Sequence, residues 1–163
     1  MIPRDHWLEM TPEELLKECE QEFRQARGRG GQKVNKTSCA VRLTHRAAGL
    51  SAAADSSRSQ RENRLLAISG LRRKIAYELR AELSADIRYE LLPEPSKRNP
   101  ARLLWAARIL DVLAVCCWEP KSAAPLLKAS TSRLTRILYR DPDLWQILNR
   151  ERVKLALPPW KGN

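Results

Sequence analysis

The chain has 163 residues, and its 30 lysine and arginine side chains outnumber 19 aspartates and glutamates, which gives a formal net charge of +11. Apolar residues make up 43% of the chain, enough for a hydrophobic core, so wholesale disorder is excluded. No uncharged apolar run approaches the ~18 residues that span a bilayer, and we expect no membrane partner.

The positive charge is concentrated in one block. Residues 23–80 contain fourteen basic and three acidic side chains, a net charge of +11 that equals the excess of the whole chain. Such a block attracts polyanions, and nucleic acid is the default partner. A well-solvated basic surface is the alternative that charge alone leaves open.

The cysteines and histidines indicate neither a metal site nor a secreted protein. The four cysteines form no C-x-x-C pair, and Cys116 and Cys117 are adjacent. This is neither a zinc pattern nor a disulfide framework. The first residues lack the regions of a signal peptide. We therefore expect a cytoplasmic monomer without a metal or another cofactor.

In chain order, the first expected element is a helix from Thr11 to about Glu22. Thr11 is a suitable cap, Pro12 suits the first helical position, and Glu14 completes a capping box. Residues 23–36 have no apolar period and are expected to form a loop. The inner face of the helix is expected to consist of Leu15, Leu16 and Cys19.

Two strands and a long helix should follow the loop. Apolar and polar residues alternate over Cys39–His45, which predicts a half-buried strand, and residues 50–54 suit a returning hairpin strand. From Ser57 to about Leu83 the apolar period becomes helical. The expected buried stripe is Leu65, Ile68, Leu71, Ile75 and Leu79, and the opposite face carries Arg61, Arg64, Arg72, Arg73 and Arg80. Residues 87–91 are either a final strand or the end of the helix.

The rest of the chain is predicted to be helical. Three prolines among residues 93–100 predict a linker, and residues 101–118 are apolar nearly all round, as in a mostly buried helix. Three shorter helices are expected over about Lys121–Lys128, after residues 130–132, and from Asp141-Pro142 to Pro158-Pro159. The expected fold class is α+β: an antiparallel sheet with a long helix over residues 1–92, then an all-α domain over residues 101–163.

The most informative segment is the loop that contains Gly30-Gly31-Gln32. Glycines let the backbone approach a ligand closely, and Gln32 would present its amide and its backbone N–H at the tip. Lysines and arginines beside them can contact phosphates; these are Arg27, Arg29, Lys33 and Lys36. Taken alone, these residues also suit a flexible basic turn.

Gly30-Gly31-Gln32, followed by Lys33-Val34-Asn35-Lys36-Thr37, resembles the GGQ loop of class I peptide chain release factors. The similarity continues through Ser38–His45 and resumes at Arg58-Ser59-Gln60, with Asn63 and Arg64 after it. It covers roughly residues 23–80. Arg29 departs from the family pattern, which usually has a small residue there, and Arg27 stands where serine is common.

The resemblance implies a domain that enters the peptidyl-transferase centre and promotes attack of water on the ester of the P-site peptidyl-tRNA. In these terms the Gln32 backbone N–H would donate to the developing oxyanion or the leaving 3′-hydroxyl, and its side chain would help place water. Gly30 and Gly31 would supply the backbone geometry. The implied partners are large-subunit rRNA, the peptidyl-tRNA and a glutamine methyltransferase acting on Gln32.

The candidate RNA-binding residues extend beyond the loop. We expect His45 to be structural and Asn63 to orient the helix N-terminus through local backbone hydrogen bonds. The full set of candidates is Arg27, Arg29, Lys33, Asn35, Lys36, Arg42, Arg58, Gln60, Arg64, Arg133 and Arg136.

Only 22 residues precede the basic loop, too few for a codon-reading domain, so we expect the short, codon-independent type that rescues stalled or split ribosomes. Residues 123–138 resemble a helix-turn-helix, with Arg133 and Arg136 on its second helix, and helices that pack only for their own sake are an equal alternative. The helical domain over residues 101–163 is expected to dock on the ribosome or tRNA. One alternative is a non-catalytic RNA- or ribosome-binding protein that kept the loop. Another is a DNA-binding regulator that uses residues 121–140.

Overall fold

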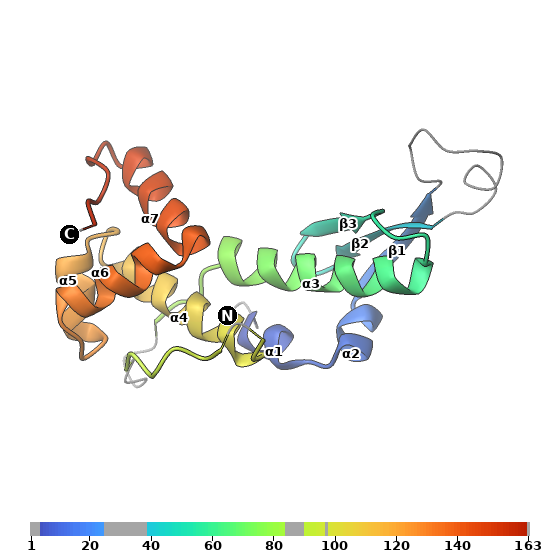
Figure 1. Cartoon of the computed structure of the whole chain (residues 1–163), viewed down its shortest axis with the longest axis horizontal. Coiled ribbons are helices and arrows are strands. Elements are labelled where there is room, and N and C mark those ends of the chain that lie inside the picture. The colour runs from blue at the N-terminus through green and yellow to red at the C-terminus, as the bar shows by residue number, and fades with distance from the viewer. Residues whose placement is uncertain (1–3, 25–38, 84–89, 97, 163) are drawn as a thin grey trace. The chain divides into compact units, whose positions relative to one another are not determined.

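The structure, a computed structural model, describes residues 4–24, 39–83, 90–96 and 98–162. The chain divides into two compact units, one of which comprises Arg4–Leu79, while the other begins at Arg80 and runs to the C-terminus. The first unit is mixed and the second is helical, which confirms the expected α+β class (Figure 1).

The first unit is a three-stranded antiparallel sheet with one long helix along it. Its strands pair in the order β1-β2-β3, and α3 packs against β2 and β3 (Figure 1). The short helices α1 and α2 pack against α3. The elements are α1 (Arg4–Glu9), α2 (Pro12–Lys17), β1 (Cys19–Arg24), β2 (Ala40–His45), β3 (Ser51–Ala54) and α3 (Gln60–Glu78).

The core of this unit lies between β2 and α3. Val41 and Leu43 are almost wholly buried, while Arg42 between them is exposed, as the alternating pattern predicts. From α3, Leu71 and Ile75 are fully buried. The strand predictions over residues 39–45 and 50–54 are therefore confirmed to within one residue at each strand's start.

The expected helix from Thr11 to Glu22 is wrong beyond Lys17. Its start is confirmed, since Thr11 Oγ1 accepts from the Glu14 N–H at 3.2 Å and the Glu14 carboxylate accepts from the Thr11 N–H at 2.7 Å. Residues Cys19–Arg24, however, form β1, which pairs with β2 along its whole length. Pairing with a neighbouring strand supplies backbone hydrogen bonds that outweigh weak local helix preference. The helix α1 was not expected.

The buried stripe of α3 is largely the expected one, since Ile68, Leu71 and Ile75 are buried, and Leu65 is the exception at 50% exposed. Asn63 and Ala67, which were not expected in the stripe, are fully buried. The helix begins at Gln60, after the cap Ser59, and ends at Glu78 rather than Leu83. The segment 84–89, which covers most of the element expected at 87–91, lies outside the described residues.

The second unit contains α4 (Ala101–Val115), α5 (Pro120–Leu126), α6 (Thr131–Arg140) and α7 (Pro142–Lys154). As expected, α4 is buried on most sides, and Asp141 caps α7 by accepting from the N–H groups of Asp143 and Leu144. Two ends differ from expectation. The helix α4 stops before Cys117 and Trp118, which adopt φ values of 51° and 58°, and α7 stops before Ala156 at φ 55°.

Two classes of feature are absent from the described part of the chain. No helix there is long and apolar enough to cross a membrane. Nor do three or more histidine, cysteine, aspartate or glutamate side chains come together there in a group that would hold a metal ion.

Candidate catalytic loop and its framework

The glycine motif itself lies outside the described residues, which stop at Arg24 and resume at Cys39. This holds for Gly30, Gly31 and Gln32 and for the flanking candidates Arg27, Arg29, Lys33, Asn35 and Lys36. The structure does describe the framework from which the segment starts. Arg24 lies opposite Ala40 in the β1–β2 register, so the chain leaves one strand and enters the next at neighbouring positions.

Asn63 ties the return point of the loop to the long helix. Its Nδ2 donates to the Cys39 carbonyl and to the Ser57 carbonyl, both at 2.7 Å, and its Oδ1 accepts from the Ser57 N–H at 2.9 Å. The side chain is fully buried in the first turn of α3. The Asn63 amide therefore connects α3 to the turn before it and to the start of β2.

The turn before α3 is fixed by further bonds. Ser59 caps the helix, since its Oγ accepts from the Glu62 N–H at 3.3 Å, and the Ser59 N–H donates to Ser57 Oγ at 3.0 Å. Ser57 Oγ in turn donates to the Glu62 carboxylate. The expected local backbone bonds of Asn63 are thus confirmed. The bond to Cys39, 24 residues away, could not be found from sequence.

Arg64, the next residue of α3, lies against the end of β1. Its guanidinium carbon is 5.6 Å from the centroid of the Phe23 ring, close enough for a cation–π contact. Phe23 is 43% exposed, and the Nε of Arg64 is buried with no hydrogen-bond partner among the described residues. A positive charge is therefore held one residue from the point where β1 ends.

The other candidates in this unit lie in two places. Arg58 and Gln60 are exposed in the turn and at the first position of α3, within two turns of Arg64 along the chain. Arg42 lies instead on the outer face of the sheet, opposite Glu22, and its Nη2 donates to Ser51 Oγ at 3.2 Å. The structure thus groups Arg58, Gln60 and Arg64 near the base of the loop and sets Arg42 apart.

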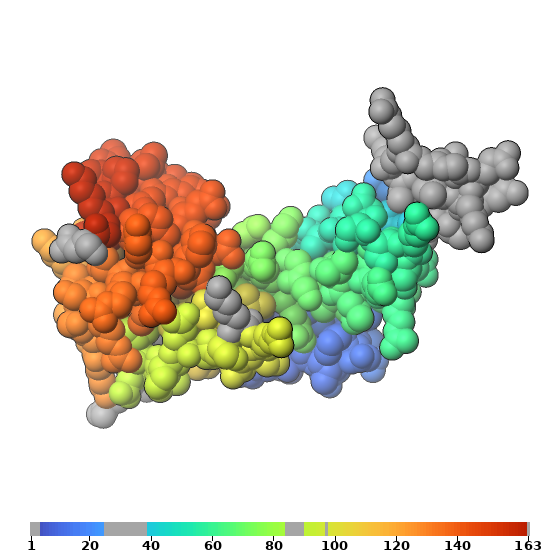
Figure 2. All heavy atoms as spheres, in the orientation of Figure 1, coloured from blue at the N-terminus to red at the C-terminus, as the bar shows by residue number. Residues whose placement is uncertain are grey.

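The arginines of α3 do not form one solvated face. Arg61 and Arg73 are exposed, on a helix whose outer surface appears in green in Figure 2. Arg72 is half-buried and donates to the Met10 carbonyl, so it fastens the α1–α2 connection, and burial lowers the pKa of its guanidinium. The expectation of a uniform basic face is wrong for Arg72.

His45 is buried at the end of β2 and belongs to the core. Its Nδ1 accepts from the Ala48 N–H at 3.1 Å, and its ring centroid lies 4.4 Å from that of Trp7. Burial lowers the pKa of His45, so the ring is neutral at neutral pH. It is positioned for packing, which agrees with the structural role expected from sequence.

The two candidates on α6 have different surroundings. Arg133 is exposed over part of its length, but its Nη2 donates to the Leu91 carbonyl at 3.2 Å and so fastens the segment before α4. Arg136 is exposed, with no ion pair or hydrogen bond from its guanidinium to the residues that the structure describes. The two arginines were equivalent candidates in the sequence, but only the Arg133 guanidinium is bonded to the protein among the described residues.

Comparison with known proteins shows which domain family this framework resembles. Residues 11–97 match the RF-1 domain, slightly more than half of the chain. Peptide chain release factor 2 of Lactiplantibacillus plantarum is 49% identical over 63 residues, which are 39% of this chain and 16% of that protein. Peptide chain release factor 2 of Thermotoga maritima is 43% identical over 81 residues (50% of this chain, 21% of that protein).

Release factors of the other type match as well. Peptide chain release factor 1 of Acidiphilium cryptum is 45% identical over 60 residues, which are 37% of this chain and 17% of that protein. The chain therefore spans about a fifth or less of the length of these relatives. The RF-1 match over residues 11–97 includes the three-stranded sheet, α3 and the Gly30-Gly31-Gln32 sequence. The chain belongs to the RF-1 domain family, that of class I release factor-like proteins with a GGQ sequence.

Proposed function

We propose that this protein hydrolyses peptidyl-tRNA on the ribosome. The observation that carries the proposal is the position of the Gly30-Gly31-Gln32 sequence within the RF-1 match, between the paired ends of β1 and β2, with Asn63 bonded to Cys39 just before β2. In this function the backbone N–H of Gln32 stabilises developing negative charge on the ester, and its side chain places water. Gly30 and Gly31 allow the backbone to approach the ester closely.

The basic residues position the loop by contacts with rRNA phosphates. Arg58, Gln60 and Arg64 contact RNA at the base of the loop, and Arg42 contacts it from the outer face of the sheet. Within the loop the same role falls to Arg27, Arg29, Lys33, Asn35 and Lys36. Phosphate contacts fix orientation without reading sequence, which suits a chain that acts at one place in the ribosome.

The proposal includes the codon-independent type of reaction, in the cytoplasm, on stalled or split ribosomes. Residues 1–92 carry the chemistry, residues 93–100 link, and residues 101–163 dock the chain on ribosomal RNA or tRNA, with Arg133 and Arg136 contributing. Large-subunit rRNA and the P-site peptidyl-tRNA are the partners, and a glutamine methyltransferase modifies Gln32. The docking role is supported by the all-helical second unit and by the exposed guanidinium of Arg136.

A release assay tests the chemistry. Ribosomes that carry labelled peptidyl-tRNA and have no stop codon in the decoding site are mixed with wild-type protein or with Gly31→Ala. Loss of preorganised backbone geometry is expected to slow release by about 10²- to 10³-fold. Gly70→Ala is the matched control, because Gly70 lies in α3 and an added Cβ would meet only the Ala52 Cβ at 3.4 Å. Equal release by Gly31→Ala and Gly70→Ala would refute the catalytic role.

The same assay separates the alternative of a non-catalytic RNA-binding protein. Such a protein would bind the ribosomes and release no peptide, whatever residue stands at position 31. Codon independence is tested by placing a stop or a sense codon in the decoding site. Equal rates with both codons are expected, and a strong preference for stop codons would overturn that part of the proposal.

A further inference from the structure

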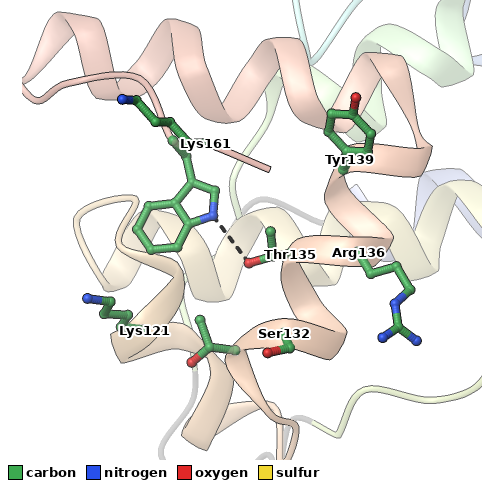
Figure 3. A pocket seen from close by; sticks show the side chains of 8 residues that line it. Lys121, Ser132, Thr135, Arg136, Tyr139 and Lys161 are labelled. Carbon is green, nitrogen blue, oxygen red and sulfur yellow. Dashed lines mark hydrogen bonds between the residues drawn. The ribbon is translucent and has the colours of Figure 1, made fainter. Parts of the chain in front are cut away.

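A hollow of about 520 Å³ lies on the second unit, between α5, α6 and the C-terminal segment. Its volume lies in the range of ordinary ligand sites. Lys121 of α5, Arg136 of α6 and Lys161 of the C-terminal segment line it, and none of its described lining residues is acidic. In the view of Figure 3, Lys121 and Lys161 lie on one side of Thr135 and Arg136 lies on the other.

These three cations have no protein partner among the described residues. Several carboxylates of the same unit pair with other cations: Glu119 pairs with Arg152, Asp141 and Glu94 pair with Arg102, and Glu151 pairs with Arg150 and Lys154. Unneutralised cations around a concave surface attract an anion strongly, because the concave wall focuses their field.

The floor of the hollow supplies hydrogen-bond donors. Ser132 lies in the first turn of α6, where the unpaired N–H groups and the helix dipole also favour negative charge, and Thr135 lies in the next turn. Thr135 Oγ1 accepts from the Trp160 indole N–H at 3.2 Å, which leaves its own hydroxyl hydrogen available to a ligand. Cations with hydroxyl donors are the set that phosphate oxygens select.

The C-terminal segment is held in place as one wall of the hollow. The Trp160 N–H donates to Asn149 Oδ1 at 2.6 Å, and the Arg152 guanidinium lies 5.2 Å from the centroid of the Trp160 ring. Gly162 lies so close to Tyr139 that an added Cβ would come within 2.8 Å of the ring. The wall that carries Lys161 is therefore packed against α6 and α7.

We infer that this hollow binds the phosphate backbone of RNA, through Lys121, Arg136 and Lys161 with Ser132 and Thr135. The inference deepens the proposed docking role of the second unit and rests on it for the choice of RNA. Tyr139, which is 62% exposed, adds a ring on which an unpaired base stacks, as in other single-strand sites. A single-stranded RNA segment is therefore the expected occupant.

Binding, not release, tests this inference, so that failure of the hydrolysis proposal does not affect the result. The full chain is titrated into a fluorescein-labelled oligouridylate of about 15 nucleotides, and anisotropy is followed from low to high salt. Loss of three phosphate contacts lowers the salt slope by about 2, which corresponds to roughly a hundredfold weaker binding at 0.1 M salt. That loss is expected for the triple variant Lys121→Gln, Arg136→Gln, Lys161→Gln.

Two further variants separate binding from folding. Ser132→Glu places a carboxylate in the hollow but also in the first turn of α6, where it favours the helix. It is expected to weaken RNA binding about tenfold without lowering the unfolding midpoint. Arg140→Gln removes one exposed cation of α6 that does not line the hollow, and it is expected to bind within about threefold of wild type.

Crosslinking locates the contact. With 4-thiouridine in the oligonucleotide, crosslinked peptides are expected from α5, α6 and the C-terminal segment. Triple-variant and Ser132→Glu affinities equal to that of Arg140→Gln would overturn the inference, as would crosslinks confined to residues 23–80. Tighter, hollow-dependent binding to duplex DNA would overturn the RNA assignment and support the helix-turn-helix alternative.

Discussion

Removal of the Asn63 side chain should loosen the base of the loop and destabilise the first unit. In Asn63→Ala, the Cys39 carbonyl loses its bond in a buried site, and the two Ser57 groups lose theirs where water has partial access. A buried orphan costs about 1–3 kcal/mol, and each partly accessible bond contributes about 0.5–1 kcal/mol. The expected loss is therefore about 3 kcal/mol.

Thermal unfolding measures this loss. For a unit of this size, 1 kcal/mol shifts the midpoint by about 4–8 °C, so Asn63→Ala should unfold on the order of 15 °C below wild type. Ser69→Ala is the matched control, because Ser69 is an exposed polar residue of the same helix. Its midpoint is expected to stay within about 2 °C of wild type, since surface substitutions have small effects. Hydrogen exchange should speed up most at the start of β2 and in the first turn of α3.

The functional consequence is separable from the loss of stability. At a temperature where Asn63→Ala is still folded, release should be slower at saturating protein, because the loop starts from a less fixed base. Ribosome affinity should change little, since Asn63 is buried and touches no solvent. A midpoint equal to that of Ser69→Ala, or unaltered release at saturation, would refute the reasoning.

Two other predictions concern buried groups. Because burial lowers the folded-state pKa of His45 below its ordinary value of 6.5, the unfolded chain binds more protons there, and stability should fall as the pH drops below about 6.5. His45→Gln should flatten this slope in unfolding curves measured across that pH range, and an unchanged slope would contradict the reasoning. Arg152 donates to the carbonyls of Trp118 and Pro158 and pairs with Glu119, so Arg152→Gln should lower the stability of the second unit by about 2–4 kcal/mol in urea titrations, and an unchanged urea midpoint would contradict this.

The parts of the fold that depend on near neighbours could be predicted from the sequence. The alternation over Cys39–His45 and the caps Thr11 and Asp141 act within a few residues, and the structure confirms all three. β1 could not be predicted in this way. Its residues Cys19–Arg24 have no clear strand pattern, and only Cys19 is buried, so the strand exists because β2 lies beside it.

The stripe of α3 was predicted correctly at Ile68, Leu71 and Ile75 and wrongly at its first position. Leu65 fits the helical apolar period but is 50% exposed, whereas Asn63 is fully buried and bonds to the Cys39 carbonyl. The buried asparagine is favoured here because an unpaired buried carbonyl costs more than the partial exposure of one leucine. The signal in the sequence was an asparagine within a run of helix-forming residues.

The net charge of +11 overstates the positive charge that is available to a polyanion. Arg4 and Arg152 are buried, Arg72 fastens the α1–α2 connection, and Arg102 pairs with two carboxylates. Each of these holds protein groups together, and substituting one should reduce stability before it affects RNA affinity. Among the exposed cations, Arg58 lies in the turn before α3, and Lys121, Arg136 and Lys161 line the hollow. In the proposed function, phosphate contacts on both units would bind RNA more tightly than a contact through one unit alone, because the second contact is then made at high effective concentration.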